Sequence, residues 1–182
     1  KMEYFKMEKI LLIVTGSISA YKSVSLANML RKEGYEVKVI LTKAALHVIP
    51  KLTFSSQGIK TYIDEDEWIN PENVLHIELS KWCDICLIAP LTANTLGKIV
   101  NGMADNLATC SVIALEKTKK LIVAPAMNTY MYENEFVQDN FNRLTRVLGD
   151  RVKIVAPTSK MLACGVEGNG ALANLSDIVK AI

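Results

Sequence analysis

Short, uninterrupted apolar runs that each open a strand-turn-helix unit most constrain the fold of this chain. In the first run, Ile10–Val14, every residue is apolar, and Lys9 precedes it. Such a run is typical of a strand covered on both faces in a parallel sheet. The sequence therefore predicts an α/β fold in a single domain, residues 1–182, with helices on both faces of a parallel sheet. The predicted strands are Lys9–Val14, Glu36–Leu41, Trp82–Ala89, Lys120–Ala124 and Arg151–Val155.

The charge balance argues against two classes of partner. The 182 residues include 21 Lys and Arg and 19 Asp and Glu, a formal net charge of +2, and neither sign forms a long block. We expect no nucleic-acid and no membrane partner, because binding either polyanion needs a concentrated basic surface. The acidic run Asp64–Glu67 lacks the spacing and the glycine of an EF-hand, so it predicts a solvated loop rather than a metal site.

The start of the chain and its cysteines indicate a cytoplasmic protein. Ile10–Val14 is too short for a secretory signal or a membrane span, and the four cysteines of a cytosolic chain are expected to be thiols. Cys83 and Cys86 leave a zinc or redox site as an alternative. Core packing is favoured, because residues three apart on a strand point to opposite faces. Cys110, in an apolar helical run, is also expected in the core, and no metal site is predicted.

A turn rich in hydroxyl groups, Thr15–Ala20, links the first strand to a helix. Val24, Ala27 and Leu30 form one face of this helix, and Gly34 ends it. Hydroxyl and backbone N–H groups at a helix N-terminus favour a bound phosphate, although an ordinary N-capped helix explains the same residues. One glycine, in place of the Gly-x-Gly-x-x-Gly pattern, favours a mononucleotide over a dinucleotide.

The second strand ends in Thr42 and Lys43, without the carboxylate that would bind the ribose hydroxyls of NAD. Lys43 leaves NADP, through its 2′-phosphate, as a minor alternative. The following segment, 44–50, predicts a short helix whose His47 we interpret as structural. Residues 52–68 have the weakest periodicity, and no functional prediction is made for them.

Two later strands lead into polar but uncharged segments, Pro90–Thr95 and Pro125–Asn128. Ligands of an open parallel sheet bind beyond the carboxyl ends of its strands, and amides and hydroxyls there suit the edge of a flavin better than a phosphate. Residues 96–106 are helix-like. Residues 107–115 are apolar nearly all round, which predicts burial in the fold or in a subunit contact. A core-facing helical stripe follows at Val137, Phe141, Leu144 and Leu148, and Gly149 ends that helix.

A glycine-rich segment, residues 157–173, follows the last strand. Ordering a segment of this kind is costly unless it serves a ligand or a lid. We therefore predict a substrate flap.

In these segments the chain resembles the homo-oligomeric flavin-containing cysteine decarboxylases. The family motif Pro-Ala-Ser-Ala-Asn-Thr stands here as Pro90-Leu91-Thr92-Ala93-Asn94-Thr95, and Pro-x-Met-Asn-x-x-Met-Trp as Pro125-Ala126-Met127-Asn128-Thr129-Tyr130-Met131-Tyr132. His76 lies in a His-Ile-x-Leu segment before a strand. The flap run Ala163-Cys164-Gly165 is similar to the clamp of the phosphopantothenoylcysteine decarboxylase branch. Departures from the family pattern are Leu91, Thr92, Tyr132 and the lack of a basic residue after the flap glycines.

The resemblance implies a Rossmann-like (flavodoxin-like) fold, FMN as cofactor, and decarboxylation of 4′-phosphopantothenoylcysteine to 4′-phosphopantetheine in coenzyme A biosynthesis. Implied catalytic residues are His76, Asn128 and Cys164, and implied substrate contacts are Asn128, Met131, Ala163 and Cys164. FMN contacts are implied for Gly16, Ser17, Ile18, Thr42, Thr92, Ala93, Asn94, Thr95, Ala126 and Met127. A peptidyl-cysteine decarboxylase and a non-catalytic FMN-binding regulatory subunit remain alternatives. The family also implies a homo-oligomer, trimer or dodecamer, with the flavin site between subunits.

Overall fold

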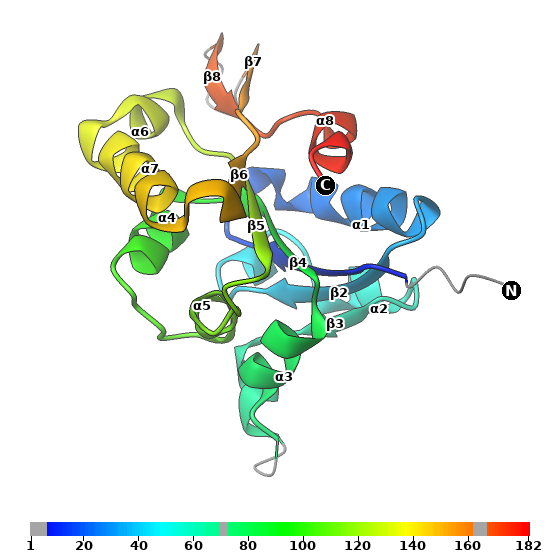
Figure 1. Cartoon of the computed structure of the whole chain (residues 1–182). Helices are drawn as coiled ribbons and strands as arrows, with labels where there is room; N and C mark the ends of the chain where they lie inside the picture. Colours follow the sequence, from blue (N-terminus) through cyan, green and yellow to red (C-terminus); the bar gives the residue numbers. More distant parts are fainter. Residues whose placement is uncertain (1–6, 70–72, 162–166) are drawn as a thin grey trace, which may run out of the picture.

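The computed structural model describes residues 7–69, 73–161 and 167–182. Within them a six-stranded sheet runs in the order β3-β2-β1-β4-β5-β6, and every neighbouring pair is parallel (Figure 1). This is the strand order of a doubly wound Rossmann sheet, so the predicted fold class is confirmed. The strands are β1 (Lys9–Val14), β2 (Glu36–Leu41), β3 (Lys60–Tyr62), β4 (Ile85–Leu91), β5 (Lys120–Pro125) and β6 (Val152–Ile154).

Helices cover both faces of the sheet. One face packs on α1 (Ser23–Lys32), α2 (Lys51–Ser55) and α8 (Leu175–Lys180). The other packs on α3 (Leu75–Trp82), α4 (Ala93–Val100), α5 (Leu107–Ile113) and α7 (Glu135–Leu148). Alternate residues of β1 enter the two cores, Ile10 on the first face and Leu11 on the second, which explains why the run is apolar throughout. The remaining helices are η1 (Ile18–Lys22), η2 (Ala45–His47), η3 (Asp64–Trp68), α6 (Thr129–Glu133) and η4 (Gly149–Arg151).

Several helix boundaries differ from the prediction. The helix-like run 96–106 ends at Val100, and Gly102 then takes a φ of +67°, a left-handed conformation that glycine adopts at little cost. The buried face of α1 also differs slightly from the predicted one: Val24 is only partly buried, whereas Leu26 is fully buried. Among the described residues, no helix is long and apolar enough to cross a membrane.

The cysteine pair is buried, but for a different geometric reason than expected. Cys83 ends α3 and precedes the strand, so it and Cys86 belong to the same core cluster instead of opposite faces. Burial raises the pKa of the Cys83 thiol to about 11 and that of Cys86 well above its usual value. The core prediction for Cys110 is wrong, because this residue is only half-buried and its Sγ donates to the Ala104 carbonyl at 3.3 Å.

The acidic run also differs from its prediction. It forms the 3₁₀ helix η3 instead of a solvated loop. Three of its four carboxylates are bound within the fold: Asp64 accepts from the backbone N–H of Leu107 at 3.0 Å, Asp66 binds Lys51 at 2.6 Å, and Glu67 binds His76.

The predicted flap includes an antiparallel hairpin of β7 (Thr158–Met161) and β8 (Glu167–Ala171), which stands beyond the carboxyl edge of the sheet (Figure 1). The Met127 N–H donates to the carbonyl of Gly170 at 2.9 Å. A Cβ at Gly170 would lie 2.2 Å from the Met127 oxygen, so only glycine permits this approach. Ala163, Cys164 and Gly165 lie outside the described residues, and the flap function stays a prediction.

Candidate active site

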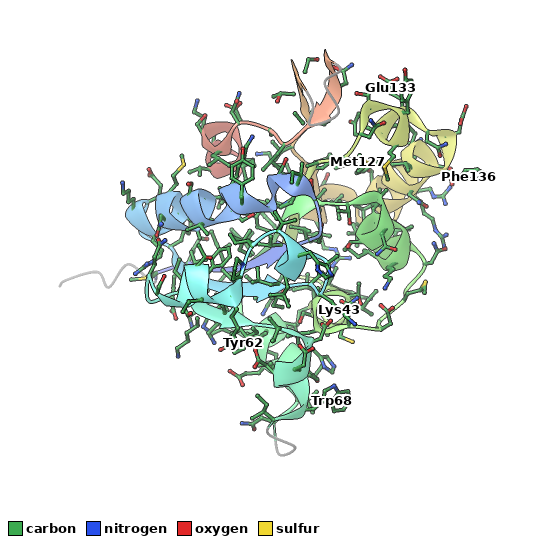
Figure 2. All side chains as sticks on the ribbon, turned by 180° about the vertical axis from the view of Figure 1, so that it is seen from behind. Lys43, Tyr62, Trp68, Met127, Glu133 and Phe136 are labelled. Atoms are coloured by element: carbon green, nitrogen blue, oxygen red, sulfur yellow. The ribbon has the colours of Figure 1, made fainter. Side chains whose placement is uncertain are left out.

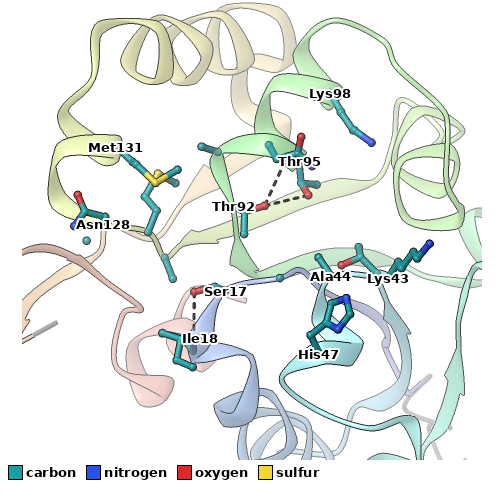
Figure 3. Close-up of a pocket in the computed structure, with 18 of the residues that line it drawn as sticks. Ser17, Ile18, Lys43, Ala44, His47, Thr92, Thr95, Lys98, Asn128 and Met131 are labelled. Atoms are coloured by element: carbon teal, nitrogen blue, oxygen red, sulfur yellow. Dashed lines mark hydrogen bonds between the residues drawn. The ribbon is translucent and has the colours of Figure 1, made fainter. Parts of the chain in front are cut away.

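A cavity of about 1180 Å³ opens at the carboxyl ends of β1, β2, β4 and β5 (Figure 3). It lies where the strand order reverses between β1 and β4, the place where doubly wound sheets bind ligands. Its lining residues come from the segments that follow these strands, including α4 and α6, from the start of η3, from the loop between α4 and α5, and from β8. They are Gly16, Ser17, Ile18, Ser19, Tyr21, Lys22, Thr42, Lys43, Ala44, His47, Asp64, Thr92, Ala93, Asn94, Thr95, Lys98, Asp105, Asn106, Ala126, Met127, Asn128, Met131, Gly170 and Ala171.

A buried hydroxyl joins the ends of the two central strands beneath this cavity. Thr15 is 1% exposed, and its Oγ1 donates to the Pro90 carbonyl at 2.7 Å while it accepts from the Thr92 N–H at 3.0 Å. Ser23 adds a second link by donating to the Ala89 carbonyl at 2.9 Å. These bonds fix the turn after β1 against the turn after β4, and no sequence motif indicates them.

The turn after β1 also lies tightly against the turn after β2. A Cβ at Gly16 would be 2.4 Å from the Cβ of Ala44, so a larger residue would push the two turns apart. Ser17 caps η1, because its Oγ accepts from the Ser19 N–H at 3.3 Å. The glycine is therefore needed for packing between turns, in addition to any contact with a ligand.

The N-terminus of α4 faces the cavity. Thr92 caps this helix by accepting from the Thr95 N–H at 3.4 Å, and the two hydroxyls are 3.2 Å apart (Figure 3). The partial positive charge of a helix N-terminus favours electronegative ligand atoms. Across the cavity, Asn128 caps α6 by accepting from the Tyr130 N–H at 2.9 Å, which fixes the carboxamide at the end of β5.

The charged groups of the lining give a small positive excess. The three lysines Lys22, Lys43 and Lys98 stand against the two aspartates Asp64 and Asp105, a difference of one positive charge. Lys98 binds Asp105 at 2.5 Å and lowers the pKa of that carboxyl by hydrogen bonding. The cavity thus suits a ligand that is polar over most of its surface and anionic at one end.

Twelve of the residues predicted to bind FMN or substrate line this one cavity: the ten FMN residues, Asn128 and Met131. Their contacts with a ligand stay predictions. His76 is not among the residues of its own chain that line the cavity; it lies on α3 next to Glu67. His47, interpreted above as structural, is exposed and lines the cavity (Figure 3). No periodic pattern identifies His47, because it belongs to a three-residue 3₁₀ helix, which is too short for a period to emerge.

Comparison with known proteins decides the family. The model of the family described as Flavoprotein matches residues 3–182. The chain belongs to the flavoprotein family. One relative in this family, the phosphopantothenoylcysteine decarboxylase of Arabidopsis thaliana, is 44% identical over 178 residues, which are 96% of this chain and 83% of the relative. The resemblance predicted from the motifs is confirmed.

Two solved structures match the flavoprotein fold described above. A mutant of PPC decarboxylase complexed with pantothenoylaminoethenethiol superposes with a TM-score of 0.89 at 43% identity, covering 96% of both chains. The FMN binding protein AtHal3 superposes with a TM-score of 0.85 at 44% identity, covering 96% of this chain and 94% of the other.

Proposed function

We propose that this chain is an FMN-dependent decarboxylase that converts 4′-phosphopantothenoylcysteine to 4′-phosphopantetheine. The observation that carries the proposal is the 43% identity over 96% of the chain with a PPC decarboxylase in complex with pantothenoylaminoethenethiol. The step in coenzyme A biosynthesis and a cytoplasmic location are part of the same proposal.

The residues present fit FMN. A cavity of about 1180 Å³ is large enough for a flavin mononucleotide together with a small substrate. Its donors are hydroxyls, amides and backbone N–H groups, which suit the polar edge of an isoalloxazine, and its single excess positive charge suits one phosphate. Thr92, Asn94 and Thr95 would hold the flavin from α4, and Gly16 and Ser17 from the turn after β1.

Loss of carbon dioxide from a cysteine leaves an unstabilised carbanion unless an electron sink is formed first. FMN, when bound, would accept two electrons from the substrate to create this sink and would return them when the saturated product forms. The Asn128 carboxamide, which can both donate and accept, would orient the substrate carboxylate. Cys164 would supply a proton during formation of the saturated product, and His76 would relay a proton beside the substrate.

His76 requires a second copy of the chain to reach the cavity. Two exposed apolar residues directly follow Glu67, the partner of His76, in the sequence: Trp68 at 83% and Ile69 at 75% exposure. A different exposed apolar side chain, Phe136 at 82%, lies at the start of α7 on the outer surface (Figure 2). Two unlike surfaces that pair head to tail form a ring when the rotation between copies closes, as the resemblance to trimeric relatives implies here. We therefore infer a homo-oligomer with trimeric rings, each cavity receiving His76 from the neighbouring copy.

Mixing two inactive variants tests the shared site. His76→Asn and Asn128→Ala each remove one contribution, and random mixing of the two chains regenerates complete sites at about a quarter of positions in a head-to-tail ring. Wild-type protein taken through the same dissociation and reassembly is the control. Full recovery of the control without any recovery in the mixture would show that both residues act within one chain.

Turnover tests the reaction itself. We expect purified protein to release carbon dioxide from 4′-phosphopantothenoylcysteine and form 4′-phosphopantetheine, whereas a peptide ending in cysteine should not react. A flavin-loaded protein that acts only on the peptide would favour the peptidyl-cysteine alternative. One that acts on neither would favour the regulatory subunit.

A further inference from the structure

The side chain of Glu67 holds His76 at two points. Its Oε1 lies 2.6 Å from the Nδ1 of the imidazole, and its Oε2 accepts from the backbone N–H of His76 at 3.0 Å. The Glu67 side chain is 13% exposed and that of His76 26%. One carboxylate therefore fixes both the ring and the main chain of the residue that the proposed function places in the site.

The backbone contact has a local cause. His76 lies in the first turn of α3, whose N-cap residue, Val74, has no side-chain oxygen to accept the free N–H groups there. Glu67 supplies that acceptor from nine residues upstream, and its negative charge is favoured at a helix N-terminus. The same carboxylate then has its second oxygen directed at the ring.

The helix that presents Glu67 is itself anchored on both sides. Asp64 accepts from the Leu107 N–H of α5 at 3.0 Å. Asp66 binds Lys51 of α2 at 2.6 Å and accepts from the Ile63 N–H at 2.8 Å. A rigid support of this kind keeps a functional side chain within narrow limits of its working position. Exposed Glu65, on the same helix, has no bonded partner among the residues that the structure describes.

An ionised carboxylate only accepts hydrogen bonds, so the Nδ1 atom of His76 must carry a proton in this contact. Proton exchange is then left to Nε2, on the far side of the ring, for which residues 7–69, 73–161 and 167–182 offer no hydrogen-bond partner. We propose that Glu67 is the positioning residue for His76: it fixes the Nδ1–H tautomer and leaves Nε2 to face the substrate. This inference rests on the proposed function of His76.

Glu67→Gln tests the inference, because an amide can either accept from Nδ1–H or donate to bare Nδ1 and so no longer selects one tautomer. Glu65→Gln removes the same charge from the same helix and is the matched control. Long-range ¹H–¹⁵N spectra of the neutral imidazoles report the tautomer. The chain has only two histidines, and the His76 signals are those lost in His76→Asn.

We expect the Nδ1–H form of His76 in the wild type and in Glu65→Gln, and a mixture in Glu67→Gln. The kcat for carbon dioxide release should fall about a hundredfold in Glu67→Gln, the order of loss for a misplaced catalytic group, with KM and flavin content unchanged. An Nε2–H tautomer in the wild type, or a kcat in Glu67→Gln equal to that of Glu65→Gln, would overturn the inference. A wild type that releases no carbon dioxide refutes the proposed function instead, while its spectrum still tests the Glu67 contact.

Discussion

Replacing Thr15 with valine removes the hydroxyl that joins the ends of β1 and β4 without leaving a cavity, since the two side chains have nearly the same volume. The Thr92 N–H loses its acceptor, which costs about 1–3 kcal/mol for a buried donor. The Pro90 carbonyl loses one bond worth about 1 kcal/mol but keeps the Thr15 N–H at 3.3 Å. Because Thr92 is only partly buried, we expect a total loss of about 2–3 kcal/mol in the free energy of unfolding.

Thermal unfolding measures this loss. For a chain of this length, about 2–3 kcal/mol corresponds to a fall in Tm of roughly 5–10 °C. The variants are compared at equal protein concentration, because the proposed homo-oligomer would make Tm concentration-dependent. Thr15→Ser is the matched control: it keeps both hydrogen bonds and loses one methyl group, about 1 kcal/mol. Flavin retention should also weaken in Thr15→Val, because Thr92 caps the helix that lines the cavity. A valine variant as stable as the wild type, or more stable than the serine variant, would refute the reasoning.

Three further predictions concern the flap, the core and the cavity rim. In Gly168→Ala the new Cβ would lie 2.1 Å from Thr129 Oγ1, so urea unfolding should show a less stable protein. Thr129→Ala should partly restore stability in the double variant, and additive effects of the two substitutions would contradict this contact. Burial raises the pKa of the Cys83 thiol from 9.0 to about 11, so its contribution to stability is complete below pH 9. The free energy of unfolding should fall by up to roughly 3 kcal/mol between pH 9 and 11, and Cys83→Ala should reduce this fall. The same pH dependence in Cys83→Ala as in the wild type would contradict the prediction. Lys98→Gln should move the NMR titration of Asp105 to higher pH, because Lys98 holds that pKa down, and an unmoved titration would show that the ion pair does not form in solution.

Elements whose burial repeats regularly could be predicted from the sequence. The first strand was predicted with its observed bounds because its residues enter both cores. The stripe from Val137 to Leu148 likewise predicted α7 and its end at Gly149. β3 was missed, since only three residues of it pair at the edge of the sheet and only Thr61 is buried. Short edge strands have too few positions for a period to emerge.

The cavity could be predicted only in part. Residues that directly follow a strand line its wall, because parallel strands end at one edge of the sheet, while their contacts with a ligand stay predictions. Long-range pairs could not be found this way: Thr15 meets Pro90 across 75 residues, and neither residue belongs to a motif that joins them. The contact between Glu67 and His76 could not be predicted either, because an acidic run is typical of a solvated surface. Only the tertiary structure shows which donor each carboxylate binds.

A flavin mononucleotide bound at the carboxyl edge of the parallel sheet is central to the proposed function. The visible absorption spectrum of the purified protein, with mass analysis of the compound released on denaturation, tests this most directly. We predict a flavin spectrum and release of FMN in a ratio approaching one molecule per chain. Release of a nicotinamide dinucleotide, or a protein that stays colourless after incubation with FMN, would contradict the account.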